Sequence, residues 1–318
     1  MSRFPRPRTI ALGLALTAVS CISITSTSSH HQSETDSMHA NNVAVLTAPG
    51  ESDLVIFVGG RETLYVHDEA GDETGQEYDL GFELKVMAPG PDRAVWALDV
   101  DHGAHRLQFG SDGSLLSNEL EFSVVPSEDL AVAADGGSIY VVDEDRVYQY
   151  GTDGTPIIDV PINRAGSAPI EYSTPRIAVD HTTGFVHTPE MAYMDYIDPW
   201  QWGVRVVRYN SDLSSGQATD TIFQEGPVYL VDFEISDRNL AWIRGWSGGG
   251  GFLEIVSSGE VRDTGSRYDT SDLEAGSLST AGVQSSLADC GGQGAIVWQA
   301  RDNSWMHTLL RHTICADW

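Results

Sequence analysis

A strand–turn–strand unit recurs six times between Val43 and Arg311, and this repetition restricts the fold more than any other feature of the chain. Successive copies lie 40 to 56 residues apart. A period of this length, built from short strands, is typical of a β-propeller. Each copy opens on a small apolar pair and a turn residue, and the copies are centred on Ala48, Ala88, Ala134, Val179, Ile235 and Ala288.

The residues after each apolar pair predict the remaining strands of a blade. Short runs rich in Val, Ile, Tyr, Phe and Trp, such as Leu54–Val58 and Thr63–Val66, predict strands b and c. Asp112-Gly113 and Asp153-Gly154 supply the positive φ of a tight c–d turn. The expected fold is therefore all-β, a six-bladed propeller of four-stranded antiparallel blades. No outer strand follows Arg311, so the sequence does not predict how the ring closes.

The segment Leu130–Ile158 carries the clearest family resemblance. It contains Ala-Val-Ala-Ala-Asp-Gly-Gly-Ser-Ile-Tyr-Val-Val-Asp and then Tyr-Gly-Thr-Asp-Gly-Thr. It resembles one repeat of the six-bladed propellers built from NHL or YVTN-type repeats, and the likeness extends to the other repeats in outline. Those families include scaffolds, ligand-binding proteins and a few enzymes, so the resemblance implies a fold and not a reaction.

The amino terminus predicts export. Three arginines precede the apolar run Ile10–Val19 and then Ser20-Cys21, which is a secretory signal too short for an ordinary transmembrane helix. Residues 16–21 resemble a bacterial lipobox, which implies cleavage before Cys21 and lipid on that residue. Ala18 stands where such motifs usually have Leu, and ordinary secretion with cleavage at the same bond stays open. The expected organisation is signal peptide 1–21, flexible tether 22–42 and propeller 43–318.

The cysteines and the tether fit this organisation. With Cys21 lipidated, Cys290 and Cys315 remain as a pair that an oxidising compartment can join in a disulfide. Two unpaired buried thiols are the alternative. The segment 22–42 is rich in Ser and Thr with few apolar residues, so it is predicted not to pack a core. Its histidines, which include His30 and His31, are interpreted as solvated.

The charge restricts the partners. The formal net charge is −28, and loss of three arginines with the signal peptide takes it to −31. Such a surface repels nucleic acid and anionic lipid, so membrane contact is expected only through an acyl anchor. Lys85 is the single lysine of the chain. The 276 residues after the tether fit one propeller, expected as a monomer at the bacterial cell envelope, or secreted if it is not lipidated.

The fourth repeat carries a long insertion between strands b and c, from His187 to Trp202. Its aromatic rings suit a protein or carbohydrate partner, because they offer a large contact area at a low entropy cost. Folding of the insertion over its own blade is the alternative. Connections b–c of one propeller share a face, so this face is expected to carry the binding residues Tyr193, Asp195, Tyr196, Asp198, Trp200, Trp202, Trp246 and Trp305.

The equivalent turn of the second repeat combines carboxylates with imidazoles. Asp99, Asp101, His102 and His105 lie within seven residues and are of the types that bind zinc or calcium. An ordinary hairpin turn is the alternative. Apart from such a divalent metal, the sequence identifies no cofactor.

No catalytic motif is present in the sequence, which favours binding over catalysis. The function expected is an exported, lipid-anchored propeller that binds a protein or glycan at the cell envelope. A metal-dependent hydrolase or lyase with its site at the propeller axis is the first alternative. A structural or assembly scaffold is the second.

Overall fold

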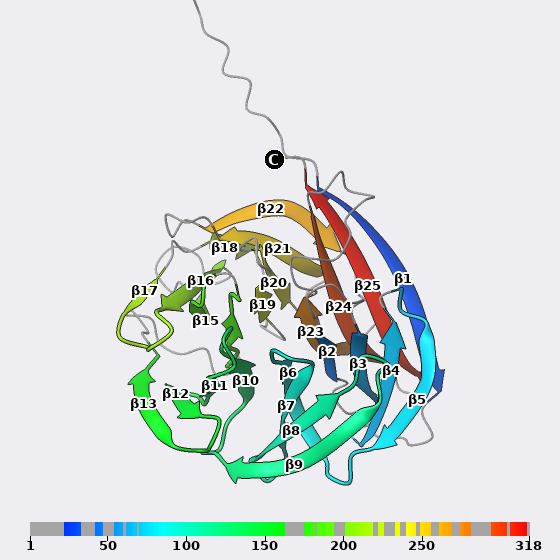
Figure 1. Cartoon of the computed structure of the whole chain (residues 1–318). Coiled ribbons are helices and arrows are strands. Elements are labelled where there is room, and N and C mark those ends of the chain that lie inside the picture. The colour runs from blue at the N-terminus through cyan, green and yellow to red at the C-terminus, as the bar shows by residue number, and fades with distance from the viewer. Residues whose placement is uncertain are drawn as a thin grey trace, which may run out of the picture.

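The computed structural model describes residues 22–32, 42–46, 54–59, 62–68, 70–162, 175–181, 183–193, 201–218, 222–225, 233–235, 240–245, 249–255, 261–268, 274–280, 294–303 and 306–316. The elements found in these residues are β-strands, and they form antiparallel sheets arranged radially around a central axis (Figure 1). None of the described residues belongs to a helix long and apolar enough to cross a membrane.

The described strands form six sheets. The first sheet contains β2 (Asn42–Leu46), β3 (Leu54–Gly59), β4 (Thr63–Asp68) and β5 (Glu73–Asp79). The second contains β6 (Leu84–Pro89), β7 (Ala94–Asp99), β8 (Gly103–Phe109) and β9 (Leu115–Ser123). The third contains β10 (Asp129–Val132), β11 (Ser138–Val142), β12 (Arg146–Gly151) and β13 (Pro156–Pro161).

The other three sheets are built in the same way. The fourth contains β14 (Ala178–Val179), β15 (Val186–Tyr193), β16 (Gln201–Tyr209), β17 (Gly216–Ala218) and β18 (Ile222–Glu225). The fifth contains β19 (Phe233–Ile235), β20 (Leu240–Gly245), β21 (Gly249–Ile255) and β22 (Val261–Tyr268). The sixth contains β23 (Glu274–Thr280), β24 (Gly294–Asn303), β25 (Met306–Ala316) and β1 (Ile22–Gln32).

The first strand of each sheet lies nearest the axis. These inner strands contact one another in the order β2, β6, β10, β14, β19 and β23, and β23 contacts β2 in turn. Sheets arranged in this way, each with strand order a–b–c–d, define a β-propeller with four-stranded antiparallel blades. The fourth sheet keeps the pattern, because β17 and β18 both pair with β16 and occupy successive parts of one outer edge.

The core lies between neighbouring blades. One cluster joins the first two sheets through Leu64 and Val66 of β4 and Leu107 and Phe109 of β8. A second joins the second and third sheets, where Trp96 packs with Ile139, and a third joins the third and fourth sheets. Burial of both faces of a blade explains why the b strands β3, β7 and β11 are nearly continuous runs of apolar residues.

The c–d turns also lock one blade to the previous one. Gly113 has φ +81 and Gly154 has φ +80, as the Asp-Gly pattern predicts. A Cβ atom at Gly154 would lie 2.7 Å from Cγ of Phe122 in the preceding blade. Glycine at this position is therefore required both by the backbone conformation and by the close approach of the neighbouring blade.

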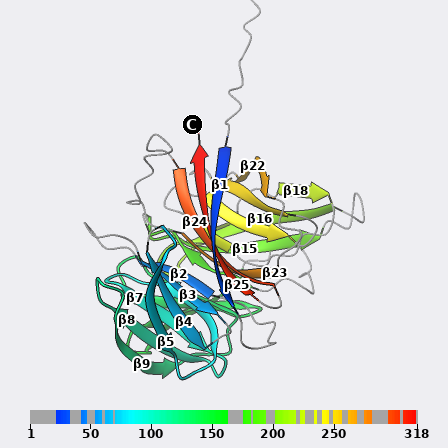
Figure 2. The same cartoon turned by 90° about the vertical axis from the view of Figure 1, so that its right-hand side faces the viewer.

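The sixth sheet is completed by the amino-terminal strand. β1 runs antiparallel to β25 over 11 residue pairs, from Ile22 opposite Ala316 to Gln32 opposite Met306. Figure 2 shows β1 beside β25 at the rim of the molecule. Two distant parts of the chain thus form one blade, and the outer edge that the sequence left without a strand is covered.

This arrangement corrects the predicted tether. Residues 22–32 were expected to be flexible because they cannot pack a core, yet they form an edge strand that hydrogen-bonds through its backbone. Edge strands have one solvated side, so a Ser- and Thr-rich sequence with isolated Ile residues suits the position. The predicted signal peptide and Cys21 lie outside the described residues.

We expect removal of residues 22–32 to destabilise the protein, because it exposes the outer edge of β25 and opens the last blade. A chain that begins at Ser33 should melt several degrees below a chain that begins at Ile22 and should aggregate on heating. Differential scanning calorimetry of the two chains measures the difference. Equal melting temperatures would contradict the role of β1 in closing the sheet.

Candidate ligand-binding face

Two kinds of connection meet on one face of the propeller. The b–c turn of the second blade contains His102, and the d–a link between the second and third blades contains Val124 and Ser127. The Val124 amide donates to the His102 carbonyl at 3.0 Å, and the Ser127 amide donates to Nδ1 of His102 at 3.5 Å. These bonds place both connections on the face that we call the b–c face.

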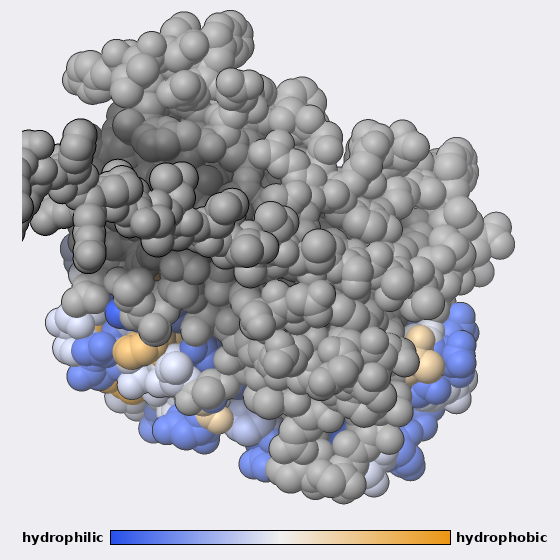
Figure 3. Space-filling view, turned by 90° about the horizontal axis from the view of Figure 1, so that it is seen from above, coloured by the Kyte–Doolittle hydropathy of each residue, from blue (hydrophilic) through white to orange (hydrophobic). Residues whose placement is uncertain are grey.

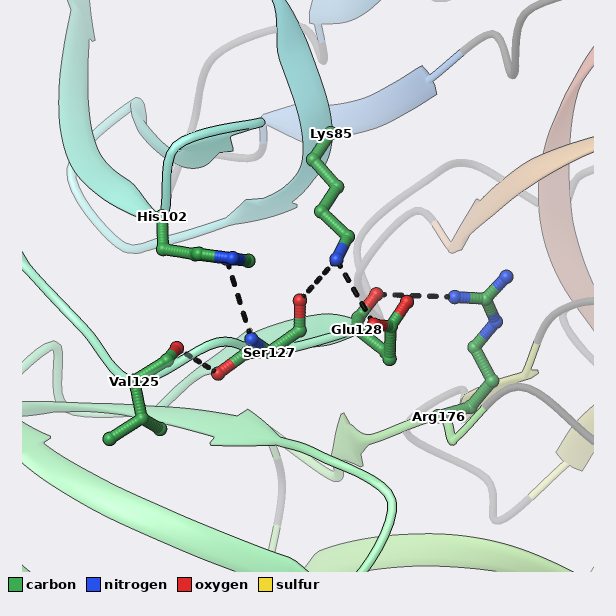
Figure 4. Close-up of polar contacts among 6 residues, drawn as sticks. All are labelled: Lys85, His102, Val125, Ser127, Glu128 and Arg176. Carbon is green, nitrogen blue, oxygen red and sulfur yellow. Dashed lines mark hydrogen bonds and ion pairs between the residues drawn. The ribbon is translucent and has the colours of Figure 1, made fainter.

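A polar cluster lies where the inner strands begin on this face (Figure 4). Lys85, the second residue of β6, donates from Nζ to the Ser127 carbonyl at 2.6 Å and pairs with Oε1 of Glu128 at 3.2 Å. Arg176, which precedes β14, donates from Nη1 to the Glu128 carbonyl at 3.5 Å. The Glu128 side chain is 42% exposed, so the cluster faces solvent in part.

The same strand ends are tied together below the exposed cluster. Asn42, at the start of β2, donates from its side-chain Nδ2 to the Lys85 carbonyl at 3.5 Å. Buried Asp129 at the start of β10 accepts the Ile177 backbone amide at 3.0 Å through Oδ2. The inner strands of four consecutive blades are therefore linked by polar bonds, which hold these strands in register with one another.

Sequence analysis did not single out this cluster as a site. Its members precede or begin the inner strands, one or two residues before the buried apolar residues of each repeat. Alignment of the repeats on their inner strands, instead of on their turns, would have placed Asn42, Lys85, Glu128 and Arg176 at similar positions. Their chemistry differs from repeat to repeat, so no shared motif marks them.

The predicted metal residues of the second blade do not form a metal site. Asp99 ends β7, and its Oδ1 accepts the amides of Asp101 and Gly103 at 2.8 and 2.7 Å. Its Oδ2 lies 2.9 Å from Nε2 of His105, which stacks on Phe82. Among the residues whose side chains the structure describes, no group of three or more His, Cys, Asp and Glu residues is placed to hold an ion.

Asp99 instead organises the turn. Burial opposes its ionisation, but the hydrogen bonds from His105, Gly103 and Asp101 outweigh burial and lower the pKa of the carboxyl group. The charged carboxylate therefore holds a turn in which His102 adopts a positive φ of 66. This matches the ordinary hairpin that was the alternative to a metal site.

The insertion of the fourth blade is largely an extended hairpin. His187–Tyr193 belong to β15 and Gln201-Trp202 belong to β16, so the connection is limited to residues 194–200. Tyr193 lies directly opposite Trp202 at the end of the ladder. Among the described residues, β14 pairs only with Val186 and His187, so the hairpin continues beyond its inner strand.

The other predicted binding residues lie outside the described residues. Asp195, Tyr196, Asp198 and Trp200 fall in the connection between β15 and β16. Trp246 falls between β20 and β21, and Trp305 falls between β24 and β25. All of these connections join strands b and c of their sheets, and the common face of their residues stays a prediction.

The base of the extended hairpin contains buried polar groups. His187 and Thr188 are each 1% exposed, and Nδ1 of His187 and Oγ1 of Thr188 have no hydrogen-bond partner in the described structure. Burial lowers the pKa of His187 from 6.5 to about 4, so its imidazole is neutral at pH 7. Phe185, whose ring is covered by the Arg208 guanidinium at 4.7 Å, meets the imidazole edge-on.

The described part of the surface offers no broad apolar patch for a partner. On the face seen in Figure 3, the described residues are mostly hydrophilic, with a few separate hydrophobic positions. Among the residues whose side chains are described, the exposed large hydrophobic ones are Val100, Leu116, Leu120, Ile157 and Ile158. Four of these belong to the outer strands β9 and β13, and isolated residues of this kind are normal on a protein surface.

Comparison with known proteins shows the fold. No protein-family profile and no curated protein sequence matches the chain. The PQQ-bound aldose sugar dehydrogenase from Streptomyces coelicolor is similar with a TM-score of 0.51 and 13% identity, over 90% of this chain and 98% of that one. The β-propeller domain of Cps50 (Swd1) from Myceliophteria thermophila gives a TM-score of 0.51 and 8% identity, over 84% of this chain and 82% of that one. Both support a β-propeller, and identities this low carry no activity across.

The buried imidazole of His187 should make the protein sensitive to acid. Because its pKa is 6.5 unfolded and about 4 folded, protons bind preferentially to the unfolded chain, and stability falls as the pH drops from 6.5 to 4. The loss from this residue is on the order of 3 kcal/mol. In His187→Leu, urea unfolding at several pH values should show a shallower decline over that range.

Thr188→Val provides the control, since it changes the adjacent buried polar side chain without removing a titratable group and should keep the slope of the wild type. Buried His67, whose pKa is also lowered by burial, remains in both variants and contributes equally to each. An unchanged slope in His187→Leu would contradict the assignment to His187.

Proposed function

We propose that the protein is an exported, lipid-anchored six-bladed β-propeller that binds a protein or glycan partner through its b–c face. On this proposal, the six sheets are all the blades of one ring, and β1 closes the ring by completing the sixth. The contact of β23 with β2 supports a single closed ring, because it joins the last inner strand to the first.

The observation that carries the binding proposal is the extended hairpin β15–β16. It continues along the b–c face beyond its inner strand and ends in the opposed pair Tyr193 and Trp202. Its connection adds Tyr196 and Trp200, and Trp246 and Trp305 belong to b–c connections of the following blades. The strand β18 pairs with Gln201–Val204, so the hairpin extends as part of a three-stranded ladder. Aromatic residues at the end of such a ladder are suited to anchor a partner.

The position of Cys21 supports an orientation for the anchor. Ile22 begins β1 opposite Ala316, the last residue of β25, whereas the b–c connection lies at the other end of β25. An acyl group on Cys21 would therefore stand at the face opposite the b–c face. The membrane would hold the propeller with its proposed binding face directed away from the lipid.

A disulfide between Cys290 and Cys315 also belongs to this proposal. Cys315 lies within β25, and its partner in the neighbouring strand β24 is Gly294. Cys290 precedes Gly294 by four residues, which is within the reach of a short connection. A bridge there would tie the a–b connection of the last blade to its third strand.

An enzyme of the kind suggested by the PQQ-bound neighbour has less support. PQQ carries carboxylates, which need free cations at the axial opening. Lys85 and Arg176 are the cations described there, and both donate to Ser127 or Glu128. Lys85 and Arg176 are therefore already engaged by protein groups, and the described residues do not fit this cofactor.

The aromatic tip should contribute most of the affinity for a partner. Trp200→Ala and Trp202→Ala should each weaken binding by about 2 kcal/mol or more, roughly 30-fold, without lowering the melting temperature. A glycan array and a pull-down from envelope extracts can supply the ligand, and biolayer interferometry then measures affinity. Leu120→Ala, on the outer strand β9, serves as the exposed hydrophobic control.

Full affinity in both tryptophan variants, combined with melting temperatures several degrees lower, would show that the rings pack against their own blade. The hairpin would then be a structural extension, and the proposal of a binding tip would be wrong.

Lipidation is tested by metabolic labelling with a fatty acid. The wild type should be labelled and should fractionate with membranes, because the acyl chain is the only membrane contact that the acidic chain is expected to make. Cys21→Ala should lose both the label and the membrane association. Equal labelling of this variant would contradict the proposal, and absence of label from both proteins would favour plain secretion.

A further inference from the structure

Two backbone irregularities of the second blade direct side chains at the link to the third blade. Lys85 is the extra residue of a β-bulge in β6, because the register of β6 with β7 shifts between Leu84 and Val86. His102 has a left-handed backbone with φ 66, which is uncommon for a residue other than glycine. Bulges re-aim side chains, and uncommon backbone conformations collect at functional sites. Here both irregularities serve the same contact, since both side chains bond to Ser127.

Ser127 is the fixed point of this cluster. It is buried, its carbonyl accepts Nζ of Lys85 at 2.6 Å, and its amide donates to Nδ1 of His102 at 3.5 Å. Its hydroxyl donates to the Val125 carbonyl at 2.7 Å. These bonds hold the two side chains in place before any ligand arrives, which reduces the entropy cost of binding one.

The bonds within the cluster leave polar atoms that can bind a ligand. An ammonium group has three N–H donors, and Lys85 uses two of them on Ser127 and Glu128. Oε1 of Glu128 accepts from Lys85, and among the described residues its Oε2 has no partner. Because Nδ1 of His102 accepts the Ser127 amide, the proton of the neutral imidazole lies on Nε2, which is a donor. The cluster therefore presents donors from Lys85 and His102 together with an acceptor from Glu128 (Figure 4).

The charges of the cluster favour a neutral ligand. Glu128 and the net charge of −28 oppose a free anion, whereas Lys85 and Arg176 oppose a free cation. A neutral ligand needs directed donors and acceptors but no unpaired charge. Hydrogen bonds between an ionised group and a neutral one are also stronger than bonds between two neutral groups.

Neighbouring hydroxyl groups of a sugar meet these requirements, because each hydroxyl is both a donor and an acceptor. Nζ of Lys85 and Oε1 of Glu128 are 3.2 Å apart, which is close to the separation of two neighbouring hydroxyl oxygens on a pyranose ring. One hydroxyl can therefore accept from the ammonium while the next donates to the carboxylate. The two side chains are 25% and 42% exposed, so a ligand can reach both.

We propose that Lys85, Glu128 and His102 form a subsite for adjacent hydroxyl groups of a neutral saccharide. Lys85 donates to one hydroxyl oxygen, Glu128 accepts from the neighbouring hydroxyl, and His102 donates from Nε2 to a further oxygen of the sugar. This inference rests on the proposed binding role of the b–c face, and it selects a glycan instead of a protein as the partner.

The test is calorimetric titration of the purified mature chain with neutral oligosaccharides of glucose, mannose and galactose, and with oligogalacturonate as the acidic comparison. The wild type should bind a neutral oligosaccharide saturably, with equal affinity at low and high salt, because no charge is neutralised. Lys85→Met and Glu128→Gln should each weaken binding at least about 10-fold, as expected when a hydrogen bond to a charged group is lost. His102→Asn, which tolerates the positive φ, should weaken it about 5-fold.

Two variants serve as controls. Glu119→Gln makes the same change as Glu128→Gln on the exposed outer strand β9, and it should bind like the wild type. Lys85→Arg retains the charge and the donors, so it should retain binding that Lys85→Met loses. Melting temperatures separate loss of the subsite from loss of the fold, and if Lys85→Met does not fold, Glu128→Gln decides.

The proposal is overturned if no neutral oligosaccharide binds, if oligogalacturonate binds more tightly than the neutral sugars, or if Glu128→Gln keeps full affinity. A protein partner that binds the aromatic tip, without any sugar binding, would overturn this inference alone and leave the proposed function in place. Sugar binding that is lost in Glu128→Gln but survives Trp200→Ala and Trp202→Ala would support the subsite and reject only the aromatic tip.

Discussion

The backbone ladder between β1 and β25 is the interaction on which the ring depends. In an open row of blades, the last blade would present the edge of β25 to solvent, and unpaired strand edges invite association with other chains. Pairing over 11 residues covers this edge. It also joins the two ends of the chain, so the blade cannot separate from the ring unless a whole ladder of hydrogen bonds breaks.

Polar bonds and apolar packing have different roles within the propeller. Apolar clusters fill the spaces between blades, one of which contains Leu64 and Leu107 and another Trp96 and Ile139. Such packing is tolerant of small shifts, whereas a charged bond such as Lys85 to Glu128 has a defined geometry. The polar cluster around Lys85 and Glu128 thus helps to align neighbouring inner strands. The apolar packing between blades is non-directional. The same cluster uses the single lysine of a strongly acidic chain.

Local pattern predicted most strands, and long-range pairing accounts for what it missed. Ser138–Val142 and the other b and c runs were predicted within a few residues, because apolar strands and Asp-Gly turns are encoded over short distances. β1 was missed because its partner lies at the other end of the chain and its composition resembles a linker. Asp99 was predicted as a metal ligand, and in the structure its carboxylate bonds instead to residues close to it in sequence.

The closing ladder also sets the order in which the protein can be completed. The ribosome synthesises the chain from its amino terminus, so β1 is made before the other described strands and its partner β25 is made after them. Ile22 and its partner Ala316 are 294 residues apart, which corresponds to roughly 15–60 s of synthesis at about 5–20 residues per second. Throughout that interval β1 has no blade to join, while five of the sheets can already assemble from neighbouring segments. The polar sequence of β1 suits the interval before β25 is made. A segment with few apolar residues has little tendency to associate with other parts of the chain during synthesis.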